Sequence, residues 1–185
     1  MKQKVSDYIA EYIAQWGIRD VFTVTGGGAM HMNDAFGHHK MLHCTYQHHE
    51  QACAMAAEAY ARLGNKMAAV CVTTGPGATN AITGVLGAWM DSIPMLVFSG
   101  QARYATTVSA SGLPLRSMGV QECNIVPVVK SLTKYAHMIV HPENIRYHLE
   151  KALYLAVNGR PGPVWLDIPL DVQGAVIETD DLRSE

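Results

Sequence analysis

Hydrophobic positions at the start of the chain switch from a helical spacing to a strand-like one. From Val5 to Trp16 apolar residues recur every three or four positions, which predicts an amphipathic helix that ends at Gly17. The next apolar run, Val21–Val24, is short and β-branched, as in a strand, and leads into a glycine cluster. A second short apolar run, Ala68–Val72, is also followed by a glycine cluster. We expect both runs to be strands and each strand to lead into a helix.

The rest of the chain continues this alternation. Residues 48–63 and 78–89 are rich in small residues, as expected of helices packed closely against a sheet. Met95–Phe98 is apolar without alternation, which indicates a parallel strand covered on both faces. The remaining expected elements are a polar segment over 101–119, a short helix near Asn124, a strand around Thr133, a helix over 142–157 and a strand at 164–168. This order predicts an α/β fold, a three-layer doubly wound parallel sheet with helices on both faces, whose ligands lie beyond the carboxyl ends of the strands.

Composition favours one globular domain and argues against nucleic acid or a membrane as a partner. The 185 residues are 49% hydrophobic and 16% charged, which is enough for one core. The formal net charge of −2 provides no broad positive surface for a phosphate polymer or for anionic lipids. Charges occur throughout the first residues and no apolar run reaches about 18 residues, so we expect a cytoplasmic protein.

The cysteine and histidine patterns favour neither disulfides nor a metal. The four cysteines lack C-x-x-C spacing and lie in or near apolar segments, as free thiols of a reducing compartment do. Six of the nine histidines fall between His31 and His49, which raises the alternative of a metal site. However, H-E-x-x-H is absent, and adjacent histidines point in different directions on any regular element, so we expect no metal ligands here.

Two strand-to-helix turns contain glycine clusters, which raises the alternative of a nucleotide site. In the first turn His31 occupies the third position of a G-x-G-x-x-G fingerprint, and in the second turn Asn80 occupies it. Neither residue permits the close helix packing that the third glycine supplies. A P-loop is also excluded, because the sequence has no Gly-Lys pair. Turns that bind no ligand stay an alternative for either cluster taken alone.

Glu50 is the carboxylate that needs an explanation, because it begins an alanine-rich helix that is expected to be buried. A buried carboxylate must be paired, hydrogen-bonded or protonated. A structural ion pair with Arg62 is one alternative, although Arg62 lies about three turns further along the same segment, which makes direct contact unfavourable. A chemical role is the other alternative.

Seven short blocks follow one another along most of the chain. They are His49–Ala52, Ala57–Arg62, Thr74–Asn80, Asp91–Pro94, Gln121–Glu122, Thr133–Lys134 and Gly159–Val164. In content, order and spacing they resemble the amino-terminal pyrimidine-binding domain of thiamine-diphosphate enzymes of the acetolactate synthase type. Each block is short, but seven together make a chance agreement negligible.

The resemblance implies that Glu50 is the catalytic residue. Its carboxyl would bond the N1′ nitrogen of the aminopyrimidine and promote the proton transfer that activates C2 of the thiazolium. Decarboxylation of a 2-oxo acid follows, and the remaining unit passes to a second carbonyl or is protonated. Further implied roles are contacts to the cofactor, an active-site entrance and, in flavin-containing members, contact with FAD. The residues at the matching positions are Gly27, Gly28, Pro76 and Asn80 for the cofactor, Gln121 and Lys134 for the entrance, and Arg160 for FAD.

One departure and one absence limit what the resemblance implies. The first glycine loop, Thr25–Ala29, lacks the proline that is common in the family, which leaves the 2-oxo acid and its acceptor open. The family holds the cofactor's diphosphate through Mg²⁺ on a second α/β domain with a G-D-G motif, and the 185 residues lack that motif. We therefore interpret 1–175 as the pyrimidine-binding domain and 176–185 as a linker. The diphosphate-binding domain then lies elsewhere in a longer protein or in a partner chain.

Self-association is also expected, because the two helices rich in small residues have more apolar faces than one small sheet can cover. The resemblance also implies self-association, because members of the family form their active site between two subunits. A homodimer is the smallest assembly that we expect. A non-catalytic assembly domain, which uses the same fold only to dimerise, is the alternative from a different functional class.

Overall fold

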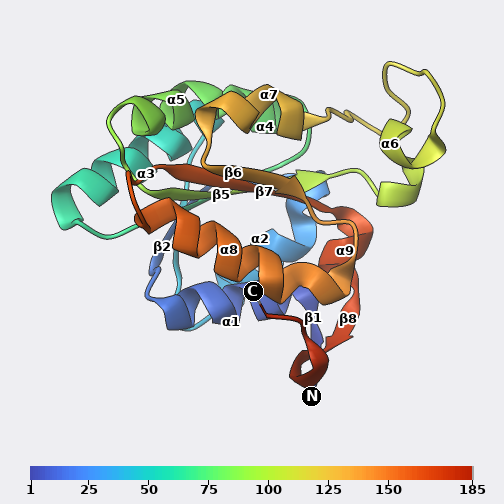
Figure 1. Ribbon diagram of the computed structural model, residues 1–185, viewed down its shortest axis with the longest axis horizontal. Helices are drawn as coiled ribbons and strands as arrows, with labels where there is room; N and C mark the ends of the chain where they lie inside the picture. Colours follow the sequence, from blue (N-terminus) through green and yellow to red (C-terminus); the bar gives the residue numbers. More distant parts are fainter. Residues whose placement is uncertain (185) are drawn as a thin grey trace.

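The computed structural model describes residues 1–184 and contains a six-stranded sheet between two layers of helices (Figure 1). The strands are β2 (Asp20–Thr23), β3 (His43–Tyr46), β4 (Ala69–Val72), β5 (Met95–Gln101), β6 (Tyr135–Met138) and β7 (Pro163–Pro169). Their order is β3-β2-β4-β5-β7-β6, and every neighbouring pair is parallel. The predicted α/β fold with a doubly wound parallel sheet is confirmed.

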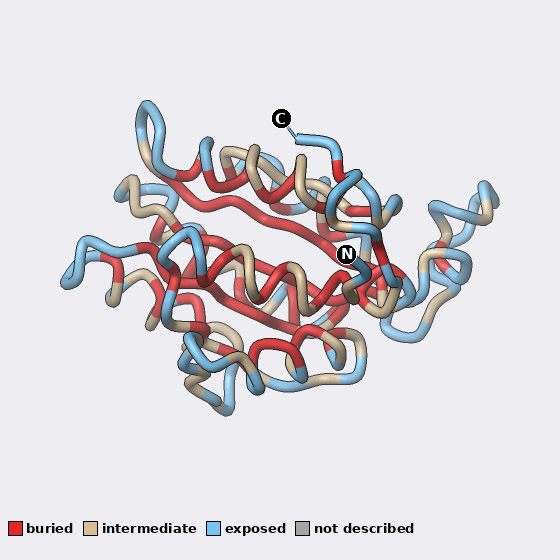
Figure 2. The backbone as a smooth tube through the Cα atoms, turned by 90° about the horizontal axis from the view of Figure 1, so that it is seen from below, coloured by how far each residue is buried: buried red, intermediate tan, exposed pale blue. Residues whose placement is uncertain are grey.

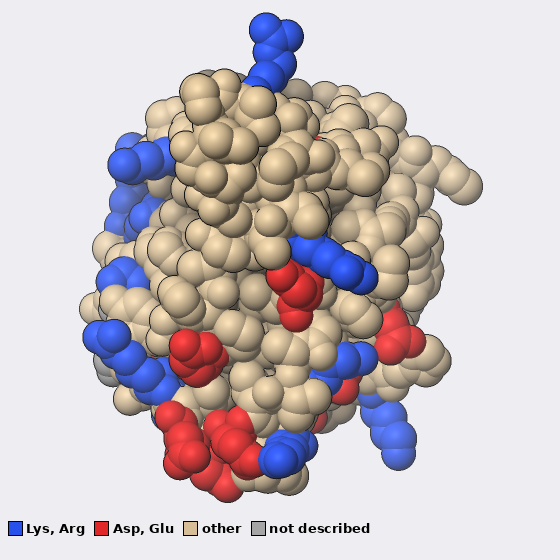
Figure 3. Space-filling view, turned by 90° about the vertical axis from the view of Figure 1, so that its right-hand side faces the viewer, with Lys and Arg blue, Asp and Glu red and all other residues tan. Residues whose placement is uncertain are grey.

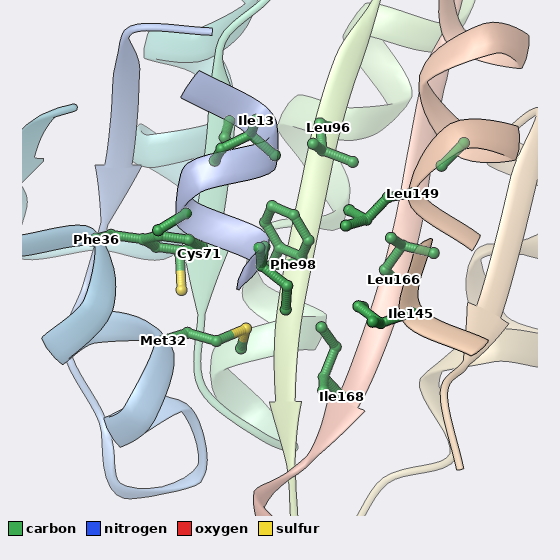
Figure 4. Packing of buried hydrophobic residues seen from close by; sticks show 14 of the residues in the cluster. Ile13, Met32, Phe36, Cys71, Leu96, Phe98, Ile145, Leu149, Leu166 and Ile168 are labelled. Atoms are coloured by element: carbon green, nitrogen blue, oxygen red, sulfur yellow. The ribbon is translucent and has the colours of Figure 1, made fainter. Parts of the chain in front are cut away.

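Four helices cover the lower face of the sheet in Figure 1. They are α1 (Val5–Trp16), α2 (Met30–His38), α8 (Ile145–Val157) and α9 (Leu170–Gly174). Figure 4 shows Phe98 of β5 and Leu166 of β7 facing Leu149 of α8, with Phe36 of α2 beside them. All four are at most 1% exposed, and burying such a side chain stabilises the fold by about 1.5–3 kcal/mol.

The upper face is covered by a second layer with smaller side chains. Its helices are α3 (Glu50–Gly64), α4 (Pro76–Asn80), α5 (Ile82–Met90) and α7 (Ile125–Val129). A Cβ on Gly84 of α5 would lie 2.6 Å from the Cβ of Ala54 on α3, so these two helices pack closely. Burial follows the layers, because the strands and the inward sides of the helices are buried (Figure 2). Helix α3 thus packs closely on α5, and its Ala54 and Ala57 are buried in one core cluster with Val70 and Val72 of β4, as expected of an alanine-rich helix on a sheet.

Several boundaries differ from the expected ones. The single helix expected over 78–89 is two helices, α4 and α5, because α4 begins at Pro76 and ends in a tight turn from Ala81 N to Ala78 O. The strand expected around Thr133 begins at Tyr135. Strand β3 and helix α2 had no predicted bounds, and the polar segment contains the short helices η2 (Tyr104–Thr106) and α6 (Val108–Ser111).

The two ends of the described chain lie side by side in a small second sheet. Strands β1 (Lys2–Lys4) and β8 (Val176–Glu178) pair antiparallel. Ile177 and Leu182 of the predicted linker are buried in the lower core. The linker role of residues 176–185 stays a prediction, and Glu185 lies outside the described residues. None of the helices in residues 1–184 combines the length and apolar character needed to cross a bilayer.

Candidate functional site

The turns that follow β2, β4, β5 and β7 meet at the carboxyl edge of the sheet, on the right-hand side of Figure 1. Parallel strands bring such turns to one edge, which is where open α/β sheets bind ligands. Figure 3 looks onto this side. Charged side chains gather over its lower part, near the chain ends, and are sparse over its upper part. The edge therefore presents a mostly neutral surface.

Glycines let the backbones of these turns approach one another. Gly75 has φ +57°, and a Cβ there would lie 2.0 Å from the carbonyl oxygen of Gln121. Gly28 donates its N–H to Thr73 Oγ1 at 3.0 Å, which joins the turn after β2 to the turn after β4. A Cβ on Gly100 would overlap the carbonyl oxygen of Gly28 at 2.0 Å. The turn after β4 thus lies backbone to backbone against the segment at Gln121, and the turn after β2 lies in the same way against the end of β5.

Glu50 lies against the second glycine turn. It is the first residue of α3 and is partly buried. Its Oε2 accepts a hydrogen bond from Asn80 Nδ2 at 2.7 Å, and a Cβ on Gly77 would lie 3.4 Å from its Oε1. Arg62 pairs with Glu58 and Asp91 instead of Glu50, so the structural ion pair is not formed. The carboxylate is therefore held by an amide and lies beside Gly77 of the second glycine turn.

A cavity of about 380 Å³ opens at the same edge. It is lined by two predicted site glycines, by Gln121, by apolar side chains and by one cation. The lining includes Gly27, Gly28, Met30, Thr74, Gln101, Arg103, Val120, Gln121 and Leu170. Its volume falls in the range of about 300–1,000 Å³ that is typical of small-molecule sites.

Lys134 and Arg160 lie at the opposite, amino edge of the sheet. Lys134 directly precedes β6, and Arg160 precedes β7. Both line a separate cavity of about 390 Å³ together with Trp89, and Arg160 donates to Ser92 Oγ at 2.6 Å. The seven residues of β7 separate the two edges by about 20 Å at 3.3 Å per residue. The structure therefore brings Gly27, Gly28, Glu50, Pro76, Asn80 and Gln121 to one edge, without Lys134 and Arg160.

Sequence reasoning missed the polar groups beneath the cavity. Thr74 Oγ1 donates to Gln101 Oε1 at 2.8 Å, and Gln101 Nε2 donates to Asp167 Oδ2 at 3.1 Å. Asp167 is 0% exposed, and this burial raises its pKa to about 7. A carboxylate inside a strand that is otherwise buried and apolar is the signal that identifies this group, because such a residue needs hydrogen-bond partners.

In the part of the chain that the structure describes, the cysteines and histidines form neither a disulfide nor a metal-binding cluster. The four cysteines are free, and burial raises the pKa of Cys53 and of Cys71 to about 12, so these two stay protonated thiols. Within residues 1–184, no three or more His, Cys, Asp and Glu side chains gather closely enough to hold a metal ion.

Comparison with known proteins now identifies the family. Residues 3–114 match the family described as thiamine pyrophosphate enzyme, N-terminal TPP binding domain. The chain belongs to this family. It is 36% identical over 174 residues to acetolactate synthase 2, chloroplastic, of Zea mays, 35% identical to acetolactate synthase, chloroplastic, of Arabidopsis thaliana, and 34% identical over 181 residues to acetolactate synthase 2, chloroplastic, of Nicotiana tabacum.

The matched region is a small part of those relatives. It covers 92–96% of this chain but only 24–26% of each relative. The predicted membership of the thiamine-diphosphate enzymes, through an amino-terminal domain of the acetolactate synthase type, is confirmed. The activity of the whole protein is a separate question.

The described residues fit the pyrimidine half of the family's cofactor. The resemblance implies an acid beside a flat ring, and the edge supplies a partly buried carboxylate near Gly77 and the side chain of Thr73. Gly27, Gly28 and Gln121 line the adjoining cavity. Asn80, predicted as a pyrimidine contact, donates its amide to Glu50. The roles assigned to these residues stay predictions.

Proposed function

We propose that this chain is the cofactor-activating part of a thiamine-diphosphate enzyme that decarboxylates a 2-oxo acid and transfers the resulting acyl unit to a second carbonyl. The observation that carries this proposal is the placement of Glu50 at the carboxyl edge, held by Asn80 against Gly77. The acetolactate synthases among its relatives support the same reaction class.

Within this proposal, Glu50 holds a proton at the N1′ nitrogen of the pyrimidine. Asn80 fixes the carboxylate by donating to Oε2, which leaves Oε1 toward Gly77 and the ring. Gly27 leaves open space for the ligand, Gly28 lets the turn lie against Thr73 and Thr74, and Gln121 borders the place where substrate enters. When bound, the cofactor supplies the carbon nucleophile and the electron sink for decarboxylation.

The other parts of the enzyme follow from the family resemblance. We place Mg²⁺ and the diphosphate on a second domain, in the same protein or in a partner chain. Arg160 is the residue that would contact FAD if this member binds flavin, and Lys134 would border a substrate entrance. Their position at the amino edge means that they would serve a site other than that of their own Glu50. The four free thiols support the cytoplasmic location that we propose.

The deciding experiment is Glu50→Gln in the complete protein, assayed for CO₂ release from pyruvate. A glutamine still accepts the hydrogen bond from Asn80 but cannot exchange a proton, so we expect turnover to fall by about a hundredfold or more. Glu58→Gln on the same helix is the matched control, and we expect it to keep near-normal turnover. Near-normal turnover of the Glu50 variant, with unchanged folding, would refute the proposal.

A non-catalytic assembly domain is the competing interpretation. Such a domain would associate with its partner without binding cofactor, whereas an enzyme binds thiamine diphosphate with Mg²⁺. Calorimetric titration of the complete protein with the cofactor separates the two. The carboxylate beside the glycine turn favours the enzyme, because an assembly surface has no need of an acid there.

A further inference from the structure

Asp167 is a carboxylic acid inside the sheet whose partners are neutral. It lies on β7 and is 0% exposed. Ser99 Oγ donates to its Oδ1 at 2.6 Å and Gln101 Nε2 to its Oδ2 at 3.1 Å, so within residues 1–184 its partners are a hydroxyl and an amide rather than a cation. Burying an acid in this way is costly for stability, which calls for a gain elsewhere.

Gln101 uses both ends of its amide. Its Oε1 accepts from Thr74 Oγ1 at 2.8 Å and from the N–H of Ala102 at 3.0 Å. Its Nε2 donates to Asp167 at 3.1 Å and to the carbonyl oxygen of Cys123 at 2.8 Å. If the amide were turned over, its oxygen would face two acceptors, the carboxyl of Asp167 and the carbonyl of Cys123. The acceptor on Asp167, together with the carbonyl of Cys123 and the N–H of Ala102, therefore fixes the orientation of Gln101.

The groups that Gln101 holds belong to two separate segments of the proposed site. Thr74 begins the glycine turn that borders Glu50, and Cys123 follows Gln121 by two residues. The two segments touch where Gly75 meets the carbonyl of Gln121. Gln101 and Thr74 also line the 380 Å³ cavity. One buried amide thus sets the spacing between the cofactor side and the substrate side of the cavity.

The geometry points to Asp167 as a positioning residue that acts through Gln101 to hold the turn at Thr74 and the segment at Gln121 in register. This inference rests on the proposed function. It adds a buried acid that touches neither cofactor nor substrate. Asp167→Leu removes the acceptor, and Gln101→Met removes the amide while keeping most of its volume.

Ser99→Ala is the matched control, because Ser99 bonds the other oxygen of the same carboxyl and does not contact Gln101. It also leaves a buried partner, the indole N–H of Trp165, without its acceptor, so it lowers stability as well. Asp167→Asn is the conservative variant. Its oxygen can still accept from Gln101 while its NH₂ donates to Ser99. This variant should therefore keep the wild-type distance between the turn at Thr74 and the segment at Gln121.

The first measurement is the dissociation constant of thiamine diphosphate with Mg²⁺ in the complete protein. We expect Asp167→Leu and Gln101→Met to raise it about tenfold, the equivalent of one lost buried hydrogen bond, and Ser99→Ala and Asp167→Asn to leave it within about threefold. If Ser99→Ala weakens binding as much as Asp167→Leu at equal loss of melting temperature, the effect is general destabilisation and the inference is wrong. Wild-type affinity in Gln101→Met also overturns it.

The second measurement does not depend on the cofactor. Amide hydrogen exchange of the cofactor-free protein should increase in both 74–77 and 119–123 in Asp167→Leu and Gln101→Met, and in neither segment in Ser99→Ala. If either variant increases exchange in only one of the two segments, the inference is wrong, even if the protein binds no thiamine diphosphate. If the wild type does not bind the cofactor but exchange increases in both segments together in the two variants, only the proposed function is refuted.

Discussion

A single missing side chain shapes the candidate site at Gly75. The residue has φ +57°, and its Cα faces the backbone of Gln121 so closely that any Cβ would overlap the carbonyl oxygen. Two separate costs therefore oppose a side chain there, the left-handed backbone conformation and the steric overlap.

Gly75→Ala is expected to destabilise the fold by about 2–4 kcal/mol and to displace the segment at Gln121. Gly112→Ala is the control, because Gly112 has φ +65° but no atom lies within 4 Å of its Cβ position. Gly112 has ψ +7°, in the left-handed helical region, whereas Gly75 has ψ −115°, so the control variant should cost only the smaller left-handed backbone penalty, about 1–2 kcal/mol. Urea unfolding of both variants gives the difference, and equal losses would show that the contact with Gln121 contributes nothing.

Asp167 makes the stability of the protein depend on pH. Burial raises the pKa of its carboxyl from 3.8 to about 7, so between these values the folded protein keeps a proton that the unfolded chain releases. Stability from this group is complete below about pH 4, falls as the pH rises toward 7, and is constant above. Cys123 is its titratable neighbour, and its thiol pKa is itself raised, mainly by burial.

Asp167→Asn removes this ionisation. Relative to wild type, the variant should gain stability progressively between about pH 4 and 7, reaching a few kcal/mol, about 2–4, above pH 7. Urea unfolding of the two proteins across this range measures the gain. A difference that does not change with pH would mean that Asp167 does not titrate in the fold.

At the scale of residues, the sequence predicted Glu50 and the glycine turns but not the groups that hold them. Asn80 and Gln121 are identified only through the family resemblance. The sequence pattern places Gln101 at the start of a polar segment and indicates no role for it. Its role depends on Thr74, which lies 27 positions away in sequence, so no local pattern could reveal it. Contacts between strand ends become visible only when the strand order is known.

Among the elements, α3 and α5 are two of the helices that expose large apolar side chains. Met55 on α3 is 46% exposed, and Leu86, Trp89 and Met90 on α5 are 38–65% exposed. Trp89 and Met90 line the cavity at the amino edge, and Met55 and Leu86 lie on helices of the upper layer; a second copy of the chain would bury such exposed apolar side chains.

We therefore expect the complete protein to form at least a dimer in sedimentation velocity experiments. Leu86→Glu should raise the dissociation constant of that dimer about tenfold or more, because it places a charge in a surface that must lose water. Val176→Glu is the control, since Val176 is also exposed but lies on β8, away from these helices. A monomer at high concentration would contradict the packing argument without affecting the role of Glu50.

Helices and strands with one clear period were predicted well, and those without one were not. The continuous apolar runs in β5 and β7 and the three-to-four spacing of α1 correspond to observed elements. Strand β3 escaped prediction because it is an edge strand with no fully buried residue, so its sequence shows no buried face. The break between α4 and α5 was also hidden, because it falls at Ala81, an alanine that itself keeps a right-handed helical conformation.

For the molecule as a whole, the α/β class was predictable and the placement of the site residues was only partly so. Parallel strands send their following turns to one edge, which explains why Glu50, Asn80 and Gln121 meet there. Lys134 and Arg160 precede their strands and therefore lie at the other edge. Within one copy of the chain, Lys134 and Arg160 therefore line a cavity separate from the one beside Gly27, Gly28 and Gln121.

The pairing of β1 with β8 has a mechanical consequence. The strands run antiparallel, and the pair Lys2–Glu178 lies nearest to the last residues of the chain. Tension on those residues would open the three residue pairs one after another and then reach α1 through the bond from Val5 N to the carbonyl of Ala175. This ribbon therefore separates the last residues from α9, whose Leu170 lines the cavity, and tension would not reach the carboxyl edge until the ribbon had opened.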